Sequence, residues 1–547
     1  MNVKVIARIL GVYLFFFALI LVLPLSVAVY YDFFASPAVL QPPSSLAFLK
    51  TIFSTLLIAL VFWLWGRKSP DPLMRKESLF LVVAIWVFSA GLGSLPFLFS
   101  RTFDSFPNAY FETMSGFTTT GASVMCPKNY DSKTGQEIPY RKTNPRGGEK
   151  IYTFYGTIAP VKNLNGQALY TGVEAVSRGI LFWRSLIQWL GGVGIVVLFL
   201  AVLPALGVGG RFLFQTEMPG HNKDPITPRI KETASILWKI YLFLTLLEIV
   251  LLYATNEQMS FFDAVCTTFS NLSTGGFSVK NESIAAYHSV VTEWIVIAFM
   301  IIGALNFYLY FYFIKGKFKK FLDADFLFFV FILFLGIFLT VVGLFHTQHY
   351  SLTGKTVPYQ LSTAVRDGVF QAVSANTGTG FVSANFDFWP FSSHLMLLIL
   401  MFIGGMSGST SGGIKTSRLY IIFQVLFLKI KSVFRPYEVK IIRISSLEID
   451  GKMATTVLAF FALVVFFAVF GTLELVFRGF DPETAISILG CCLNNVGFAF
   501  GLAGPTESFA FLSDLDKFLC AFWMLLGRLE YFALLLLFMP SFWTKEA

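Results

Sequence analysis

Charged residues are scarce in this sequence. Asp, Glu, Lys and Arg make up only 13% of its 547 residues, about half of the roughly 25% found in ordinary soluble domains. Hydrophobic residues account for 55% of the chain, and the mean hydropathy is +0.69. Several apolar runs approach the ~20 residues that a helix needs to cross a bilayer. The composition therefore excludes a soluble globular enzyme and indicates a membrane protein that crosses the bilayer several times.

Cysteine and histidine are also scarce, with five of each. No two cysteines have the C-x-x-C spacing, so the sequence predicts neither a disulfide framework nor a zinc site. His346 and His349 have the spacing of metal ligands, but no acidic or thiol partner stands nearby. Because the apolar segments hold no paired carboxylates, nucleophile motif or metal cluster, the sequence predicts neither an enzyme nor a bound cofactor.

Positive charge exceeds negative charge, with 41 Lys and Arg against 32 Asp and Glu and a net charge of +9. In a membrane protein such an excess is first interpreted as loop charge that sets orientation, so it predicts no nucleic-acid partner. The cations gather in the connections 67–77, 206–233, 315–325 and 429–452, which we expect on the cytoplasmic side together with both termini. None of these connections is long enough for a nucleotide-binding domain, so nucleotide control would have to come from another chain.

A repeated pattern follows an N-terminal pair of apolar runs in residues 1–77. Beyond it, apolar runs come in pairs, and a less hydrophobic segment separates the members of each pair. The four segments align on one glycine, with a small residue six positions earlier and a candidate helix start thirteen positions earlier. The glycines are Gly121, Gly276, Gly380 and Gly497, the small residues are Ser115, Ser270, Ser374 and Cys491, and the candidate starts are Asn108, Asp263, Asp367 and Thr484.

This alignment predicts an all-α integral membrane fold, in which an N-terminal two-helix hairpin precedes four pseudo-repeats around a central pore. Each repeat has a helix, a pore half-helix of about 12 residues, a filter loop and a second helix. The second helices are expected in the apolar runs 179–205, 290–314, 394–428 and 516–540. The predicted units are the hairpin 1–77, repeat one 78–205 with an extracellular insert at 126–170, repeat two 206–314, repeat three 315–428 and repeat four 429–547.

The four loops between half-helix and second helix are the candidate ion site. Irregular backbone at membrane depth must be buried in protein or line a water-filled cavity. If the loops meet on an axis, their carbonyls can replace the hydration shell of a monovalent cation, and glycine permits the positive φ that turns them inward. Small residues also let membrane helices pack closely, but four matching clusters favour a pore. The predicted filter residues are Thr119, Thr120, Gly121, Thr274, Gly275, Gly276, Gly378, Thr379, Gly380, Asn495, Val496 and Gly497.

A glycine-rich segment interrupts the second helix of the third repeat. Each glycine costs a helix about 1 kcal/mol relative to alanine. The segment is not a nucleotide-binding Walker loop, because Ile414 separates Gly413 from Lys415. It is either an intramembrane gate, which we favour, or a helix kink packed on its neighbours. The candidate gate residues are Gly404, Gly405, Gly408, Ser409, Thr410, Ser411, Gly412, Gly413 and Lys415.

Arg528 is a charged residue inside the otherwise apolar stretch 518–538. An arginine at that depth costs ~2.5 to 3.5 kcal/mol unless it faces a cavity or a partner. Glu530, two residues further on, would point elsewhere on a continuous helix and make a poor partner. Arg528 is therefore either an electrostatic barrier in the pathway, and so part of the gate, or a member of a structural ion pair.

Several motifs together resemble one known family. They are SGFTTTGAS and LSTGGFS around the first two aligned glycines, CLNNVG ending at Gly497, QWLGGVG at 188–194, GGMSGSTSGGIK at 404–415 and GRLEYF at 527–532. The chain resembles the membrane subunit of Trk-type bacterial potassium uptake systems, in the Trk/Ktr/HKT superfamily. The resemblance covers residues 1–545, although the insert 126–170 is longer than expected.

The resemblance implies a function and partners. It implies potassium uptake across the bacterial cytoplasmic membrane, with K⁺ held at the filter residues, a gating loop below them and an arginine at position 528 in the pathway. It also implies a homodimer and a separate cytoplasmic nucleotide-binding subunit of the TrkA type. The main alternative is a Na⁺- or H⁺-coupled transporter of a small solute, although such transporters usually show two inverted halves. A voltage-gated channel is disfavoured, because no segment has arginine at every third position.

Overall fold

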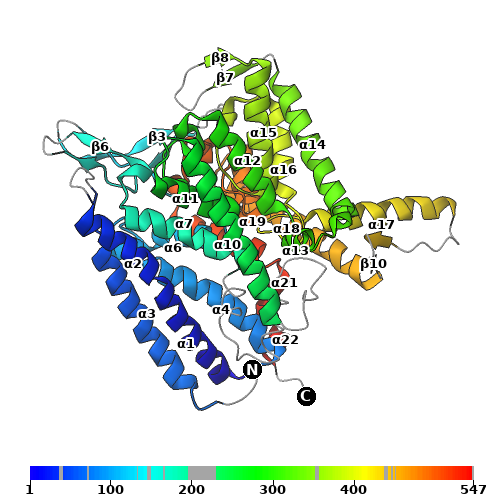
Figure 1. Cartoon of the computed structure of the whole chain (residues 1–547), viewed down its shortest axis with the longest axis horizontal. Helices are drawn as coiled ribbons and strands as arrows, with labels where there is room; N and C mark the ends of the chain where they lie inside the picture. The colour runs from blue at the N-terminus through cyan, green and yellow to red at the C-terminus, as the bar shows by residue number, and fades with distance from the viewer. Residues whose placement is uncertain are drawn as a thin grey trace.

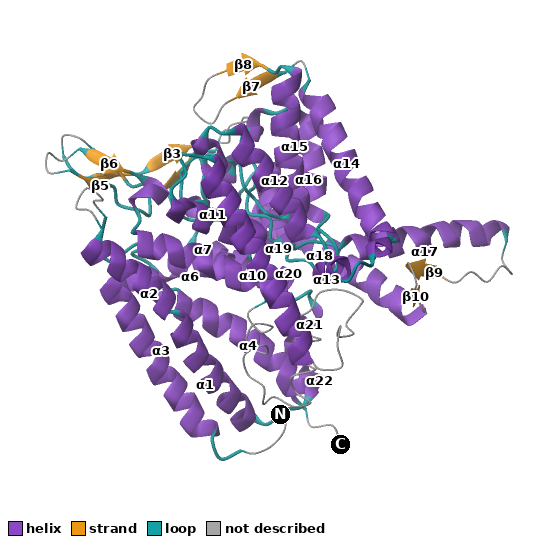
Figure 2. Ribbon diagram, viewed as in Figure 1, coloured by secondary structure: helices purple, strands orange, loops and turns teal. Residues whose placement is uncertain are grey.

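The computed structural model is mostly helical (Figures 1 and 2). Among its described residues, six helices are long and apolar enough to cross a membrane, or up to eight if each of two bent helix pairs is one span. The predicted class, a mostly helical membrane protein, is therefore confirmed. The described residues are 1–35, 41–69, 73–131, 134–143, 150–163, 167–194, 230–345, 347–350, 356–435, 442–444, 447–449 and 451–544.

The chain begins with an antiparallel helical hairpin. It consists of α1 (Val3–Ile20), α2 (Val22–Val29), the π-helical turn η1 (Tyr30–Phe34) and α3 (Ser45–Gly66). The two arms approach so closely that a Cβ built on Gly11 would lie 2.7 Å from the Trp63 amide nitrogen, and one on Gly66 would lie 2.3 Å from the Arg8 nitrogen. Small residues at these crossings allow the close backbone contact that packs membrane helices.

Asn2 and Trp543, near the two ends of the described chain, both lie at the start of α4 (Arg75–Gly93). The Asn2 amide donates a hydrogen bond to Glu77 Oε1 at 3.0 Å, and the ring of Trp543 packs edge-on against Phe80, with 5.9 Å between centroids. Figure 1 shows the N-terminus and α22 (Pro540–Trp543) side by side. The two ends therefore lie on the same side of the molecule.

Four groups of elements follow the hairpin. The first holds α4, α5 (Leu95–Phe99), α6 (Phe106–Phe117), the 3₁₀ helix η2 (Gly172–Ala175) and α7 (Arg178–Val193). The second holds α10 (Ile230–Thr255), α11 (Phe261–Leu272), η3 (Ser283–Tyr287), α12 (Val290–Ala304) and α13 (Phe307–Ile314). The predicted run 179–205 and connection 206–233 extend into 195–229, outside the described residues.

The third group holds η4 (Phe318–Leu322), α14 (Ala324–Leu344), β7 (Gln348–Tyr350), β8 (Thr356–Pro358), α15 (Leu361–Thr377), η5 (Phe386–Phe388), α16 (Phe391–Phe402) and α17 (Thr416–Phe434). The fourth holds β9 (Ile442–Ile444), β10 (Leu447–Ile449), α18 (Gly451–Phe477), α19 (Pro482–Asn494), η6 (Gly501–Ala503), η7 (Phe509–Phe511), α20 (Asp514–Arg528), α21 (Phe532–Leu535), η8 (Leu536–Phe538) and α22.

Two runs expected to be single helices are sharply bent, so those predictions were wrong. Helices α12 and α13 meet at 94° between Ala304 and Phe307, and the fourth group bends by 116° after Arg528. Glu530 and Tyr531 have φ of 54° and 67°, a left-handed conformation that a helix cannot continue through. Uniform hydrophobicity hid both breaks, because it reports burial and not backbone direction.

The predicted helix starts were also wrong. Asp263 and Thr484 are the third residues of their helices, and their amides donate to the N-cap side chains of Ser260 at 3.1 Å and Asp481 at 2.9 Å. A side-chain oxygen at the N-cap satisfies amides that the first turn leaves free. Helix α6 begins after Ser105, three residues before Asn108, but the Ser105 side chain makes no capping hydrogen bond. Helix α15 begins at Leu361, well before Asp367, and has 17 residues instead of about 12.

The insert 126–170 forms three short antiparallel hairpins, β1 (Asn129–Tyr130) with β2 (Glu137–Ile138), β3 (Tyr140–Lys142) with β4 (Tyr152–Phe154), and β5 (Val161–Lys162) with β6 (Ala168–Tyr170). Tyr152 stacks on Phe480 with 5.9 Å between ring centroids, and its hydroxyl donates to Gly479 O at 2.9 Å. Burial raises the pKa of the Cys126 thiol, and it raises the pKa of the Tyr140 hydroxyl to about 12. The insert is therefore packed against the α18–α19 connection.

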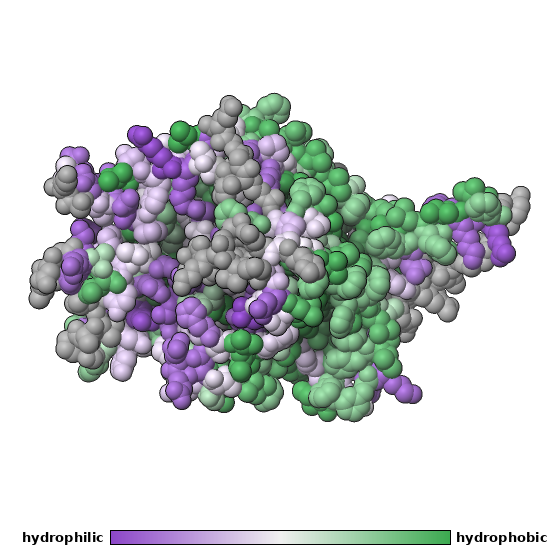
Figure 3. All heavy atoms as spheres, turned by 90° about the horizontal axis from the view of Figure 1, so that it is seen from above, coloured by the Kyte–Doolittle hydropathy of each residue, from purple (hydrophilic) through white to green (hydrophobic). Residues whose placement is uncertain are grey.

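A wide hydrophobic surface covers the end of the molecule from which α17 projects (Figures 1 and 3). On α14, which lies there, Phe331, Phe334 and Phe338 are more than half exposed. Exposed aromatic residues in such numbers are costly in water but suited to lipid.

Candidate functional site: four glycine loops and the segment against them

The half-helices α6, α11, α15 and α19 end in four loops of similar conformation, 118–122, 273–277, 377–381 and 494–498, called here the glycine loops. In each, the amide before the aligned glycine donates to the carbonyl of the small residue six positions before that glycine. This bond satisfies a carbonyl left free at the helix end. The four bonds are Thr120 to Ser115 at 2.8 Å, Gly275 to Ser270 at 2.8 Å, Thr379 to Ser374 at 3.0 Å and Val496 to Cys491 at 3.0 Å.

Positive φ values alternate along every glycine loop. The aligned glycines have φ of 85°, 73°, 83° and 104°, and two positions earlier Thr119, Thr274, Gly378 and Asn495 have 57°, 55°, 70° and 55°. A β-branched residue rarely adopts this region, so Thr119 and Thr274 hold strained backbone of the kind found at functional sites. Such alternation turns successive carbonyls out of the directions they take in helices and strands.

The four glycine loops touch one another in a closed ring. A Cβ built on each aligned glycine would strike the carbonyl oxygen of the residue before the aligned glycine in the next loop. The distances are 2.0 Å from Gly121 to Gly275 O, 1.9 Å from Gly276 to Thr379 O, 2.2 Å from Gly380 to Val496 O and 2.7 Å from Gly497 to Thr120 O. All twelve residues predicted for the filter therefore lie in these four mutually touching loops. Such a ring presents carbonyl oxygens without charged side chains, which suits a monovalent cation.

The glycine-rich segment 404–415 separates α16 from α17 and lies against the glycine loops. Gly404 N donates to Ile414 O at 3.0 Å, which closes the segment into a loop. Thr410 Oγ1 donates to Gly303 O at 3.0 Å and lies 3.2 Å from Thr274 Oγ1. A Cβ on Gly412 would lie 2.1 Å from Asn494 O. The segment therefore contacts both the second and the fourth glycine loops.

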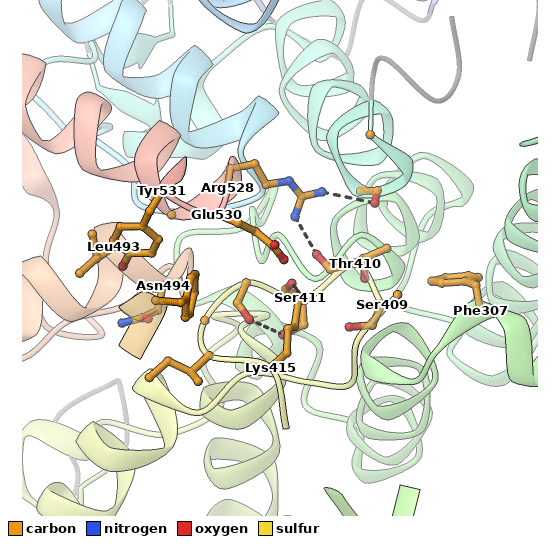
Figure 4. Close-up of a pocket in the computed structure, with 18 of the residues that line it drawn as sticks. Phe307, Ser409, Thr410, Ser411, Lys415, Leu493, Asn494, Arg528, Glu530 and Tyr531 are labelled. Atoms are coloured by element: carbon orange, nitrogen blue, oxygen red, sulfur yellow. Dashed lines mark hydrogen bonds between the residues drawn. The ribbon is translucent and has the colours of Figure 1, made fainter. Parts of the chain in front are cut away.

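Arg528, the last residue of α20, joins three parts of this site, and Figure 4 shows its guanidinium beside Thr410. Its Nη1 donates to Thr119 Oγ1 at 3.2 Å and to Thr410 O at 2.8 Å, and its Nη2 donates to the carbonyls of Gly191 and Gly192. The last two carbonyls belong to the C-terminal turn of α7, where a cation is favoured. The guanidinium therefore links the first glycine loop, the glycine-rich segment and α7.

Glu530 follows the end of α20, whereas Arg528 is the last residue of that helix. Its carboxylate forms an ion pair with Arg418 in the first turn of α17, and Lys415 Nζ donates to Ser411 O within the glycine-rich segment. The expectation that Glu530 follows Arg528 on a continuous helix was wrong, because α20 ends at Arg528. The backbone turn at Glu530 lets the two neighbouring charges reach different elements.

A cavity of about 80 Å³ lies between these groups (Figure 4). The side chains of Arg528, Lys415 and Glu530 all line it, so basic and acidic groups together face the space next to the glycine loops. At close range the Arg528 guanidinium would repel a cation in that space, and the Glu530 carboxylate, which is paired with Arg418, would attract one. Gly192, Thr410, Gly412, Asn494 and Tyr531 also line the cavity.

Two charged residues behind the first glycine loop escaped the sequence analysis. Arg184 Nε donates to Glu112 Oε1 at 2.7 Å, and both side chains are almost wholly buried. Glu112 Oε2 accepts from the Val124 amide at 2.9 Å, just beyond the first loop. The available signal was a charged residue in a predicted membrane helix, which is rare enough to mark a functional or structural site.

Gln188 was noted only within a family motif, yet it touches the second glycine loop. Its Nε2 donates to Gly275 O at 2.7 Å, and its Oε1 accepts from the Phe277 amide at 3.1 Å. Among the described residues, no group of three His, Cys, Asp or Glu side chains could hold a metal ion.

Comparison with known proteins identifies the family. The model of the family TrkH, described as cation transport protein, matches residues 162–545. The Trk system potassium uptake protein TrkH of Salmonella typhimurium is 31% identical, and that of Vibrio parahaemolyticus is 32% identical, each over 100% of both chains. The crystal structure of the potassium transporter TrkH from Vibrio parahaemolyticus superposes with a TM-score of 0.77, at 29% identity and over 100% of both chains. The chain therefore belongs to the TrkH family of cation transport proteins.

Proposed function

We propose that this chain is the membrane subunit of a bacterial potassium uptake system and that K⁺ passes through the ring of glycine loops. Its full-length relatives named as potassium uptake proteins support the substrate. The observation that carries the pathway is the ring itself, in which backbone carbonyls of four loops meet without a charged side chain among them.

Four pseudo-repeats around this ring give the simplest account of the architecture, with boundaries at 78–205, 206–314, 315–428 and 429–547. The recurring hydrogen bond to Ser115, Ser270, Ser374 and Cys491 supports it. The protein lies in the cytoplasmic membrane with both termini in the cytoplasm. The contacts of Asn2 and Trp543 with α4 support a shared side for the two termini, and the cation-rich connections support the cytoplasmic side. Membrane potential then drives entry, at about 2.3 kcal/mol per 100 mV for each cation.

The glycine-rich segment and Arg528 form the gate in this proposal. Contacts of Thr410 with Gly303 and with Arg528 hold the segment against the glycine loops. Because Arg528 donates to Thr410 O and the segment lies against Asn494 O, we take this arrangement to be the closed one. Opening requires two movements: the glycine-rich segment moves away from Asn494, and Arg528 releases Thr410 O. Because Arg528 holds that segment, the two movements are coupled.

Control of the gate requires partners in this proposal. The chain works as a homodimer with a cytoplasmic nucleotide-binding subunit of the TrkA type. The family resemblance and the relatives' names, which refer to a Trk system, support it. The Arg418–Glu530 ion pair connects α17, which projects from the body, to the residues beside Arg528. A subunit that moves α17 would thereby act on the gate.

Rubidium uptake into proteoliposomes tests the function. With an inside-negative potential, uptake should be fast, inhibited by external K⁺ and little affected by equal Na⁺. Uptake that requires a Na⁺ or proton gradient at zero potential would contradict the channel-like pore.

A further inference from the structure

Residues Arg184 and Gln188 form a cradle on α7 for the second glycine loop. They stand four residues apart, so their side chains share one helix face. Gln188 is wholly buried and holds two backbone atoms of the loop, the Gly275 oxygen and the Phe277 nitrogen. Arg184 Nη1 donates to Ser278 O at 2.8 Å, and its guanidinium lies 3.6 Å from the centre of the Phe277 ring.

The fit between Gln188 and Gly275 leaves no spare space. A Cβ built on Gly275 would lie 2.5 Å from Gln188 Cδ, so only glycine admits the amide at this position. The same Gly275 oxygen packs against Gly121 of the first loop, where a built Cβ would lie 2.0 Å away. Gln188 therefore fixes the direction of a carbonyl within the ring of glycine loops.

The contact with Gln188 makes the Gly275 carbonyl different from the equivalent carbonyls of the other three loops. The residues equivalent to Gly275 in the other loops are Thr120, Thr379 and Val496, and in the described part of the chain no side chain donates a hydrogen bond to their carbonyls. A carbonyl that already accepts a strong hydrogen bond has less negative potential to offer a cation and less freedom to move. Both the number and the field strength of coordinating carbonyls bear on selectivity among alkali cations.

We propose that Gln188 is a positioning residue that sets the Gly275 carbonyl and thereby the discrimination between K⁺ and Na⁺. The inference rests on the proposed pathway through the glycine loops. Its consequence is that selectivity depends on a residue of the first repeat that lies behind the second loop, 87 positions away in sequence.

The test compares Gln188→Leu, Gln188→Glu and Trp189→Phe by reversal potential, Rb⁺ flux and folded yield. Gln188→Leu leaves the Gly275 oxygen and the Phe277 amide unpaired, and the K⁺/Na⁺ permeability ratio should fall about tenfold. Gln188→Glu keeps the acceptor for Phe277 and should lower the ratio less. Trp189→Phe removes a bond from Nε1 to Thr245 Oγ1 at 3.0 Å that does not touch the loop, and should leave the ratio unchanged.

A role limited to helix packing would lower folded yield and flux together while the permeability ratio of the surviving pores stayed constant, and that result would overturn the inference. If Gln188→Leu does not fold, an unchanged ratio in Gln188→Glu overturns it equally. Gly276→Ser, measured alongside, distinguishes a failure of the Gln188 inference from a failure of the proposed filter. A ratio that changes in Gly276→Ser but in neither Gln188 variant removes Gln188 alone, whereas unchanged ratios in all three remove the filter as well.

Discussion

The carbonyl oxygen of Thr379 occupies the place that a side chain on Gly276 would need, because a Cβ built on Gly276 would lie 1.9 Å from it. The same relationship recurs around the ring, so a carbonyl of a neighbouring loop leaves no room for a side chain at any of the four aligned glycines. The φ of Gly276, 73°, is a second reason for glycine at this position, since left-handed backbone is strained for other residues.

Gly276→Ser and Gly380→Ser are therefore expected to lower the K⁺/Na⁺ permeability ratio, because the new side chain pushes the facing carbonyl out of the ring. Reversal potentials under mixed K⁺ and Na⁺ measure the ratio. Gly91→Ser is the matched control, since a Cβ at Gly91 meets nothing within 4 Å. Unchanged ratios in both loop variants would remove these glycines from the filter.

Arg528→Ala is expected to raise cation flux while leaving selectivity largely intact. The substitution removes a positive charge from the cavity and frees the carbonyls of Thr410 and Gly191, whereas selectivity lies in the carbonyl ring. Rb⁺ flux per folded protein measures the effect, with the exposed Arg67→Ala as control. A variant that folds normally yet conducts no faster than the parent would contradict a role of Arg528 as an electrostatic barrier.

Gly412→Ala tests the glycine-rich segment independently of charge. The added methyl group would lie 2.1 Å from Asn494 O, so the segment has to move away from the fourth glycine loop. We expect faster Rb⁺ flux at an unchanged K⁺/Na⁺ ratio. Gly451→Ala, where a Cβ meets nothing within 4 Å, should behave like the parent. Equal flux in both variants would mean that the contact with Asn494 does not limit conduction.

Glu530→Gln is expected to destabilise the protein, because Arg418 keeps its charge in a site where it is only 11% exposed. Removing one member of a buried pair costs about 3 to 5 kcal/mol, and the partial exposure here reduces that to roughly 1 to 3 kcal/mol. Thermal unfolding in detergent measures the change. The double variant Glu530→Gln with Arg418→Met should recover part of the stability that Glu530→Gln loses. If the stability changes of the two single variants simply add in the double variant, Glu530 and Arg418 are not directly coupled.

Tyr152→Ala is expected to loosen the insert from the α18–α19 connection. It removes the stack on Phe480 and the hydrogen bond to Gly479 O, together worth ~1 to 2 kcal/mol. Amide hydrogen exchange in β3 and β4 should accelerate, whereas Tyr155→Ala, at an exposed ring, should leave it unchanged. If exchange is the same in both variants, the stack on Phe480 does not hold the insert.

The pattern of the sequence determined the features that depend on local composition. Apolar runs predicted membrane-crossing helices because a bilayer requires long uncharged segments. The four aligned glycines were visible because each loop needs the same positive φ, and only glycine meets that need without strain. The glycine-rich segment stood out because a helix does not tolerate such a run. These signals also supported the family resemblance, which the comparisons confirmed.

Only the tertiary structure decided which residues meet. Arg528 donates to Gly191, 337 positions away, and Gln188 reaches Gly275 across two units. No local pattern records such pairings, because they depend on how separate helices pack. The break after Arg528 was equally hidden, since residues 529–531 include no glycine or proline. Glu530 and Tyr531 nevertheless have positive φ, and Glu530 pairs with Arg418 of another helix. Composition determined which segments are apolar enough to cross a membrane, and long-range packing determined which side chains and carbonyls meet at the site.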